Sequence, residues 1–179
     1  GKNRWKSSTI ISTSIGQGEI LATPIQIANL AALIANKGYF YTPHIIKSIE
    51  GSEIDEKYRT KHVIDIKEKY FDVVQYGMEL AVKKGTARFG QIDSLVFCGK
   101  TGTAQNPHGE DHSIFMGFAP KDKPQIAIAV YVENSGFGAT WAVPIASLMI
   151  EKYLYREISP KRKHVEKRMM ESVIDPNTD

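Results

Sequence analysis

The sequence has a single cysteine, Cys98, among its 179 residues. One thiol excludes an intrachain disulfide and a cysteine-based zinc cage. The net charge of +3 is too small an excess to indicate nucleic-acid binding by itself. Every apolar stretch is interrupted before the roughly 18 residues that a membrane span needs. What remains is an ordinary globular composition, with 42% hydrophobic and 24% charged residues, in a chain long enough for one domain.

Apolar residues at helical spacing predict three helices, over residues 24–36, 67–84 and 142–155. Thr23 is a good N-cap for the first, and Pro24 suits its first helical position. Gly38 fits the C′ position that ends this helix, and Gly85 ends the second.

β-Branched and alternating apolar residues predict strands, over residues 9–15, 39–49, 95–98, 113–119 and 125–133. Residues 50–62 are charged and are expected to form a surface loop or hairpin. The short connection between Pro120 and Pro124 makes the last two strands an antiparallel hairpin. Helices segregated from a small antiparallel sheet define an α+β fold, expected over residues 1–158. Residues 159–179 are expected to form a polar C-terminal tail or an exposed helix.

The most informative segment is the run from Val96 to Gln105, which contains Gly-Lys-Thr-Gly-Thr. A phosphate-binding P-loop would need a glycine at position 94, which is Ser94, and the residues that follow form an apolar strand instead. The alternative is the Lys-Thr-Gly triad of penicillin-interacting serine enzymes. In that chemistry Lys100 supplies a cation, and the hydroxyls of Thr101 and Thr103 can hydrogen-bond a substrate carboxylate. Gly102 leaves room for an acyl chain along the strand edge, and the Thr103 N–H can serve as an oxyanion-hole donor.

Several further motifs resemble those of class B penicillin-binding proteins, in matching order over residues 8–155. They are Ser14–Gly18, Thr23–Ala28, Lys84–Ala87, Lys100–Gln105, Phe115–Pro120 and the strand at 125–133. The run Asn106–Gly109, with Asp111 and His112 after it, is most similar to the elongation-specific type. The resemblance implies part of the penicilloyl-serine-transferase α/β sandwich, an antiparallel sheet flanked by helices. It assigns substrate and β-lactam binding to Lys100, Thr101, Thr103, Ala104 and Gln105.

The resemblance also implies a peptidoglycan D,D-transpeptidase that cross-links stem peptides and is acylated by β-lactams, without a cofactor, a metal or a nucleic acid. Its expected partners are a membrane glycosyltransferase and scaffold proteins of the elongation machinery. A membrane anchor is expected upstream of this chain, and the expected location is the periplasmic face of the inner membrane.

The catalytic serine of such enzymes lies in Ser-x-x-Lys and is followed by Ser-x-Asn. No serine of this sequence has either pattern. In the family both motifs precede Gly-Gln-Gly, so the chain is expected to be the C-terminal half of the domain, without a nucleophile and inactive alone.

Other interpretations are weighed against these. A non-catalytic peptide- or cell-wall-binding module would keep the Lys-Thr-Gly groove without a serine, and a β-lactamase relative would need a deacylating group that is not identified. His108, Asp111 and His112 could hold a metal, although a polar loop is the favoured interpretation. Cys98 is expected to be buried and inert. Phe137 and Trp141 either line the groove or pack at a helix start, and Gln17 is expected to brace its own loop.

Overall fold

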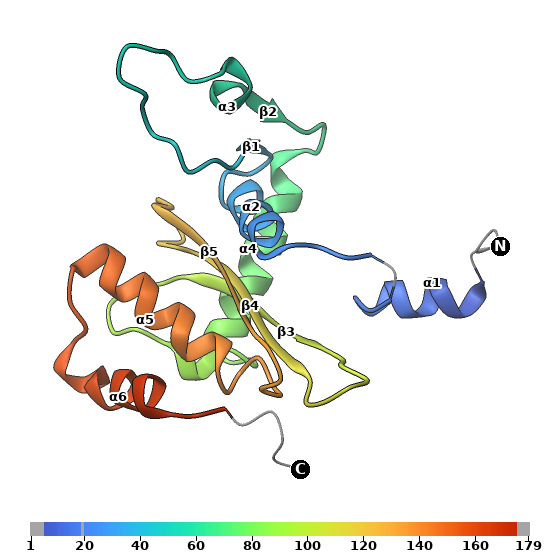
Figure 1. Ribbon diagram of the computed structural model, residues 1–179, viewed down its shortest axis with the longest axis vertical. Helices are drawn as coiled ribbons and strands as arrows, with labels where there is room; N and C mark the ends of the chain where they lie inside the picture. The colour runs from blue at the N-terminus through green and yellow to red at the C-terminus, as the bar shows by residue number, and fades with distance from the viewer. Residues whose placement is uncertain (1–5, 19, 175–179) are drawn as a thin grey trace.

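A three-stranded antiparallel sheet lies at the centre of the molecule in the computed structural model, which describes residues 6–18 and 20–174 (Figure 1). Its strands, in spatial order, are β3 (Cys98–Ala104), β4 (His112–Ala119) and β5 (Ile126–Val132). The two hairpins make β3 and β5 the edges of this sheet. The strands predicted at 113–119 and 125–133 are confirmed. The one predicted at 95–98 is misplaced, because the strand begins at Cys98 and contains the Lys-Thr-Gly residues themselves.

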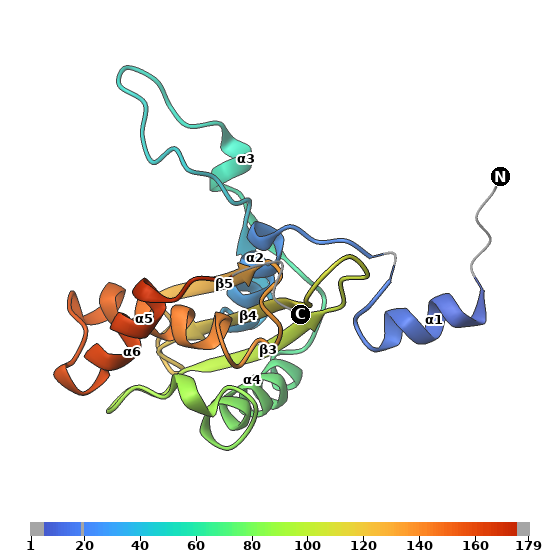
Figure 2. The same cartoon turned by 60° about the horizontal axis from the view of Figure 1, so that its bottom comes forward.

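Helices cover both faces of the sheet, which gives three layers (Figures 1 and 2). One face packs on α5 (Ala142–Tyr155), and the other packs on α2 (Pro24–Ala35) and α4 (Glu68–Lys83). Alternate side chains of each strand supply the two cores. The α5 side contains Phe115, Ile128 and Val130, whereas the α2/α4 side contains Cys98 and Phe118.

The three predicted helices are confirmed within one residue at either end. At the N-terminus of α2, the Gln26 side-chain Oε1 accepts hydrogen bonds from the Thr23 N–H at 2.8 Å and the Thr23 hydroxyl at 3.0 Å. At its C-terminus the prediction is wrong by one position, because Lys37 rather than Gly38 occupies C′, with φ of 55°. The Gly38 N–H then reaches back to the Leu33 carbonyl at 3.0 Å, which completes a Schellman turn.

The strand predicted over residues 9–15 is a helix, α1 (Ser7–Ser14). Its β-branched residues suggested a strand, but local hydrogen bonding at the helix end decides the conformation. Gly16 lies at C′ with φ of 79°, and its N–H donates to the Thr13 carbonyl at 3.0 Å. The Gln17 N–H donates to the Ser12 carbonyl at 2.9 Å, which is the second bond of a Schellman motif.

A second, two-stranded antiparallel sheet lies away from the central one (Figure 1). It pairs β1 (Tyr39–Tyr41) with β2 (Lys61–Val63), and the intervening segment contains the short helix α3 (Glu56–Arg59). The predicted strand at 39–49 is therefore only three residues long, and the charged segment at 50–62 ends in a strand.

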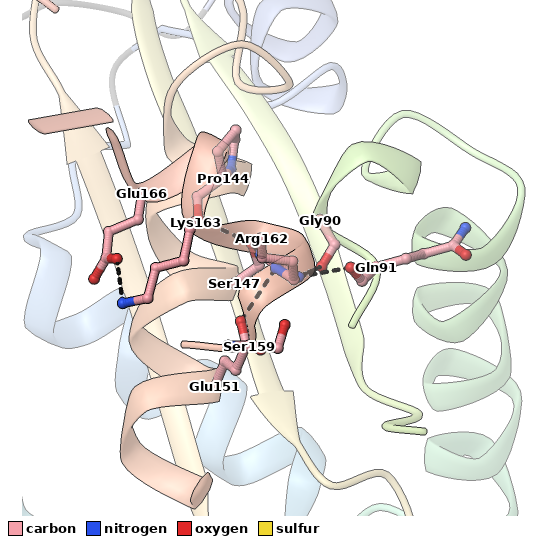
Figure 3. A network of polar contacts seen from close by, with 9 residues as sticks. All are labelled: Gly90, Gln91, Pro144, Ser147, Glu151, Ser159, Arg162, Lys163 and Glu166. Carbon is pink, nitrogen blue, oxygen red and sulfur yellow. Dashed lines mark hydrogen bonds and ion pairs between the residues drawn. The ribbon is translucent and has the colours of Figure 1, made fainter. Parts of the chain in front are cut away.

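The segment after α5 is helical, with a 3-10 turn over Pro160–Arg162 followed by α6 (Lys163–Glu171). No residue of α6 is buried, as expected for the exposed-helix alternative. Arg162 differs, because the residue as a whole is 9% exposed and its side chain contacts Ser147 and Glu151 of α5 (Figure 3). The expected boundary at residue 158 stays a prediction. Within the described residues, no helix is long and apolar enough to cross a membrane.

Candidate active site

The Lys-Thr-Gly segment lies on β3, which is an edge strand of the central sheet (Figure 2). Its register with β4 places Lys100 opposite Met116 and Thr103 opposite Ser113. Lys100 is exposed, whereas the residues from Thr101 to Ala104 are half-buried and Gln105 is exposed again. The predicted site residues therefore form one continuous stretch along a strand edge that β4 leaves open.

Two hydrogen bonds hold the first part of this stretch. The Lys100 ammonium Nζ donates to the Thr101 carbonyl at 2.8 Å. The Thr101 hydroxyl lies 2.7 Å from the hydroxyl of Thr86, in the turn after α4. The Thr86 contact was not predicted, although Lys84–Ala87 had been singled out as a motif. It joins that motif directly to the Lys-Thr-Gly strand.

The backbone of Thr103 faces the open edge of the sheet. Its carbonyl accepts a hydrogen bond from the Gln17 side-chain Nε2 at 3.0 Å. In an antiparallel strand a residue directs its N–H and C=O to the same side, and this side alternates along the strand. The Thr103 N–H therefore also points to the open edge, as does the Thr101 carbonyl two residues earlier. This is the orientation that the predicted oxyanion-hole donor requires.

Glycines allow the close packing around β3. A Cβ built on Gly99 would lie 2.1 Å from Phe115 Cζ, so this position excludes a side chain. Gly138, in the loop before α5, also packs closely, since a Cβ there would lie 2.5 Å from the Gly102 carbonyl oxygen. The Ser113 hydroxyl anchors that loop, since it donates to the Phe137 carbonyl at 3.0 Å and accepts from the Ala142 N–H at 3.1 Å.

The aromatic residues of that loop differ in exposure. The Phe137 side chain is 72% exposed. Trp141 is half-buried and occupies the N-cap position of α5. The position of Trp141 therefore agrees with packing at the start of a helix. The Phe137 side chain is the one more accessible to a ligand.

The loop between β3 and β4 is held by polar contacts within itself and with Asn134, which follows β5. The Asp111 carboxylate accepts from the Asn106 N–H at 3.2 Å, and the His112 Nδ1 accepts from the Asn134 N–H at 3.1 Å. The Asn106 amide donates to the Asn134 side-chain carbonyl at 2.6 Å. These contacts agree with the polar-loop interpretation of the segment. Among residues 6–18 and 20–174, no group of three acidic, histidine or cysteine side chains is placed to bind a metal ion.

Three charged groups beneath β3 form a separate cluster. Glu79 of α4 is 7% exposed and pairs with Lys121 at 2.5 Å and with Lys83. Hydrogen bonds from these two lysines lower the pKa of the Glu79 carboxyl. Cys98 is fully buried near by, and burial raises the pKa of its thiol to about 12. The expectation of a buried Cys98 is confirmed, and its thiol donates to the Gln75 carbonyl at 3.3 Å.

Comparison with known proteins identifies the class to which this fold and strand edge belong. Residues 1–151 match the penicillin-binding protein transpeptidase domain. The chain belongs to this family. It is 31% identical to the peptidoglycan D,D-transpeptidase MrdA of Acinetobacter baumannii, over 98% of the chain and 29% of that relative. The chain thus spans less than a third of the length of this curated relative.

Solved structures agree with the family. PBP2 of Pseudomonas aeruginosa is 37% identical, with a TM-score of 0.74, over 88% of this chain and 35% of that one. PBP2 of Helicobacter pylori, solved as a complex with MreC, is 26% identical, with a TM-score of 0.69, over 85% of this chain and 28% of that one. The predicted family and the predicted α+β transpeptidase-like fold are both confirmed.

Sequence reasoning missed the two contacts that position the motif. Gln17 was expected to brace its own loop, yet its side chain reaches β3, 86 residues further along the chain. Its place in the Gly-Gln-Gly motif was the available signal. Thr86 likewise lies within a motif, Lys84–Ala87. Neither motif indicates which strand its side chain contacts.

Proposed function

We propose that this chain forms one wall of the active site of a peptidoglycan D,D-transpeptidase. The observation that carries the proposal is the placement of Lys100 and Thr103 on an open strand edge, with the Thr103 N–H directed to that edge. Family membership supports the reaction class, because the MrdA relative is named for it.

In the proposed reaction a serine outside this chain attacks the carbonyl of a stem peptide and forms an acyl-enzyme. The peptide bond breaks, its nitrogen leaves as the terminal D-Ala, and an amine of another strand then takes the acyl group. The Thr103 N–H stabilises the oxyanion that develops during both steps. Lys100 supplies a positive charge for the proton-transfer network and for the substrate carboxylate. Thr101, Ala104 and Gln105 contact the ligand along the edge.

An extended peptide fits this edge because backbone groups of an edge strand pair with an added strand, and the Thr103 carbonyl, which accepts from Gln17, keeps a second lone pair. Gly102 leaves the strand surface open at its middle, with Ile114 as its neighbour on β4. A β-lactam presents an acyl group and a carboxylate to the same groups, and is proposed to acylate the same serine.

We also propose the remaining partners and the location. A scaffold protein of the cell-elongation machinery is one partner, as the complex of the Helicobacter pylori protein with MreC suggests. A membrane glycosyltransferase is another, since the strands to be cross-linked are made by such an enzyme. These partners place the whole protein at the periplasmic face of the inner membrane, with an anchor outside this chain.

The test is the second-order rate of β-lactam acylation by the full product of the gene. Thr103→Pro deletes the edge N–H, whereas Thr103→Ala keeps it. We expect Thr103→Pro to lower the rate by about 10²–10³-fold, the loss typical of one oxyanion-hole donor, and Thr103→Ala to lower it far less.

Lys100→Ala is also expected to slow acylation, and Lys123→Ala, an exposed lysine of the β4–β5 turn, serves as its control. Equal rates for Thr103→Pro and Thr103→Ala would contradict the oxyanion assignment. A wild-type protein that binds the β-lactam without becoming acylated would favour the non-catalytic binding module instead.

A further inference from the structure

The side chain of Gln17 connects the end of helix α1 to the strand that carries the Lys-Thr-Gly motif. Its Nε2 donates to the Thr103 carbonyl at 3.0 Å, and the residue is half-buried. The two partners are far apart in sequence, so this bond fixes two segments relative to each other. Figure 1 shows α1 lying apart from the central sheet, on the side of β3.

The backbone holds Gln17 rigidly at this place. Gly16 and Gly18 on either side have φ of 79° and 97°, values that favour glycine. The Gln17 N–H closes the Schellman turn of α1 by donating to the Ser12 carbonyl at 2.9 Å. A Cβ on Gly18 would approach Ser12 Cβ at 3.3 Å, so this turn is also tightly packed. The side chain that reaches Thr103 therefore starts from a fixed point.

The Thr103 carbonyl lacks a strand partner, since β3 is an edge of the described sheet. Without a hydrogen-bond partner for this carbonyl, the peptide group between Thr103 and Ala104 would be held only on the side that faces β4. A hydrogen bond to this carbonyl restrains rotation about the Thr103 backbone. The Thr103 N–H, which must point at the developing oxyanion, belongs to the peptide plane before the Thr103 Cα, and the bond from Gln17 acts on its direction by helping to fix the Thr103 φ and ψ angles.

We infer that Gln17 is a positioning residue, which holds the Thr103 backbone in the orientation that its N–H needs for oxyanion stabilisation. The inference rests on the proposed function. It assigns to Gln17 no contact with substrate, because the side chain acts on the carbonyl of Thr103. It also gives α1 a role, since the end of this helix then sets the position of the motif strand.

Two substitutions separate the hydrogen bond from the shape of the side chain. Gln17→Leu removes the donor and keeps most of the volume. Gln17→Glu puts a carboxylate, which cannot donate, against the carbonyl oxygen, and protonation of this carboxyl restores one O–H donor. Gln125→Leu and Gln125→Glu are the matched controls, because Gln125 is an exposed glutamine just before β5.

The assay is the second-order rate of acylation by fluorescent penicillin, measured with the full product of the gene between pH 5 and pH 8. We expect Gln17→Leu to lower the rate by roughly 3- to 10-fold, the typical effect of one hydrogen bond. We expect Gln17→Glu to be slower than Gln17→Leu at pH 8. Its rate relative to wild type should then rise as the pH falls toward the pKa of a glutamate, about 4.3 when unperturbed.

Other titratable groups do not reproduce this pH dependence. Helix α1 contains none, and β3 contains only Cys98 and Lys100. His112, opposite Ala104 on β4, is common to wild type and variant, so the ratio of their rates removes any contribution from it.

The outcomes divide cleanly. A wild-type rate in Gln17→Leu would overturn the inference, and so would a loss in Gln17→Glu that stays constant across the pH range. Recovery of Gln17→Glu at low pH supports it even if Gln17→Leu does not fold. A wild-type protein that penicillin does not acylate would instead contradict the proposed function.

Discussion

Replacement of Arg162 by methionine should strongly destabilise the domain. The guanidinium lies between α5 and the turn before β3, where it donates to the carbonyls of Gly90 at 3.3 Å and Gln91 at 2.6 Å (Figure 3). It also donates to the Ser147 hydroxyl at 2.6 Å and lies 3.1 Å from the Glu151 carboxylate. The side chains of Arg162 and Glu151 are 11% and 3% exposed. Burial lowers the pKa of Arg162, and the Glu151 carboxylate opposes this effect.

Methionine fills a similar volume but leaves Glu151 as a buried charge without its partner. Breaking a buried ion pair from one side costs about 3–5 kcal/mol. In a domain of this size 1 kcal/mol shifts Tm by about 2–4 °C, so the predicted decrease is roughly 6–20 °C. Replacing Glu151 by leucine in the same protein removes the stranded charge. The double variant Arg162→Met/Glu151→Leu should therefore be more stable than Arg162→Met.

Differential scanning calorimetry of the full gene product measures these shifts. Lys161→Met is the control, because its ion pair with Asp93 at 2.8 Å is exposed on both sides. A surface pair of this kind contributes little to the free energy of unfolding, because solvent screens both charges. Two results would contradict the stabilising role of the buried Arg162–Glu151 pair. One is a Tm shift for Arg162→Met no larger than that for Lys161→Met, and the other is a double variant less stable than Arg162→Met.

Three further predictions concern the packing beneath the motif. Gly99→Ala should lower Tm and slow β-lactam acylation, because its methyl group would overlap Phe115, and an unchanged Tm would contradict this packing. Cys98 should resist a thiol reagent at pH 8 in the native protein and react once denatured, because burial raises its pKa to about 12; rapid native labelling would show that the thiol is accessible. Glu79→Gln should lower Tm at pH 7, but its effect should decrease below about pH 4.5. The pKa of Glu79 is lower in the folded than in the unfolded protein, so ionised Glu79 stabilises the fold above its unfolded-state pKa. This stabilisation is lost as the pH falls through its folded-state pKa. A Tm difference between Glu79→Gln and wild type that does not change with pH would contradict the role of the charge.

The sequence predicts those parts of the fold in which local pattern and packing agree. Helix α5 is predicted with both of its bounds, because its apolar residues recur at helical spacing. Residues 9–15 were predicted as a strand from their β-branched residues, whereas the structure has helix α1 over Ser7–Ser14. Gly16 at C′ is the feature that should have favoured a helix there.

The site was predictable as a motif but not as a set of contacts. Lys100–Thr103 could be placed directly after a strand because apolar residues precede them, whereas the structure has them within strand β3. The bonds from Gln17 and Thr86 depend on the tertiary fold, and no local spacing reveals them. Arg162 stood within the basic run Lys161–Lys163, which suggests a solvated segment. Only the fold shows that the middle residue of this run has a buried carboxylate beside it.

The central claim, that this chain supplies the Lys-Thr-Gly wall of a penicillin-reactive site and not the nucleophile, is tested most directly by one gel. The 179-residue chain and the full product of its gene are incubated with fluorescent penicillin and compared after denaturation. We expect covalent labelling of the full product and none of the 179-residue chain. Labelling of the short chain would reveal a nucleophile within it, and absence of labelling in both would contradict the transpeptidase function.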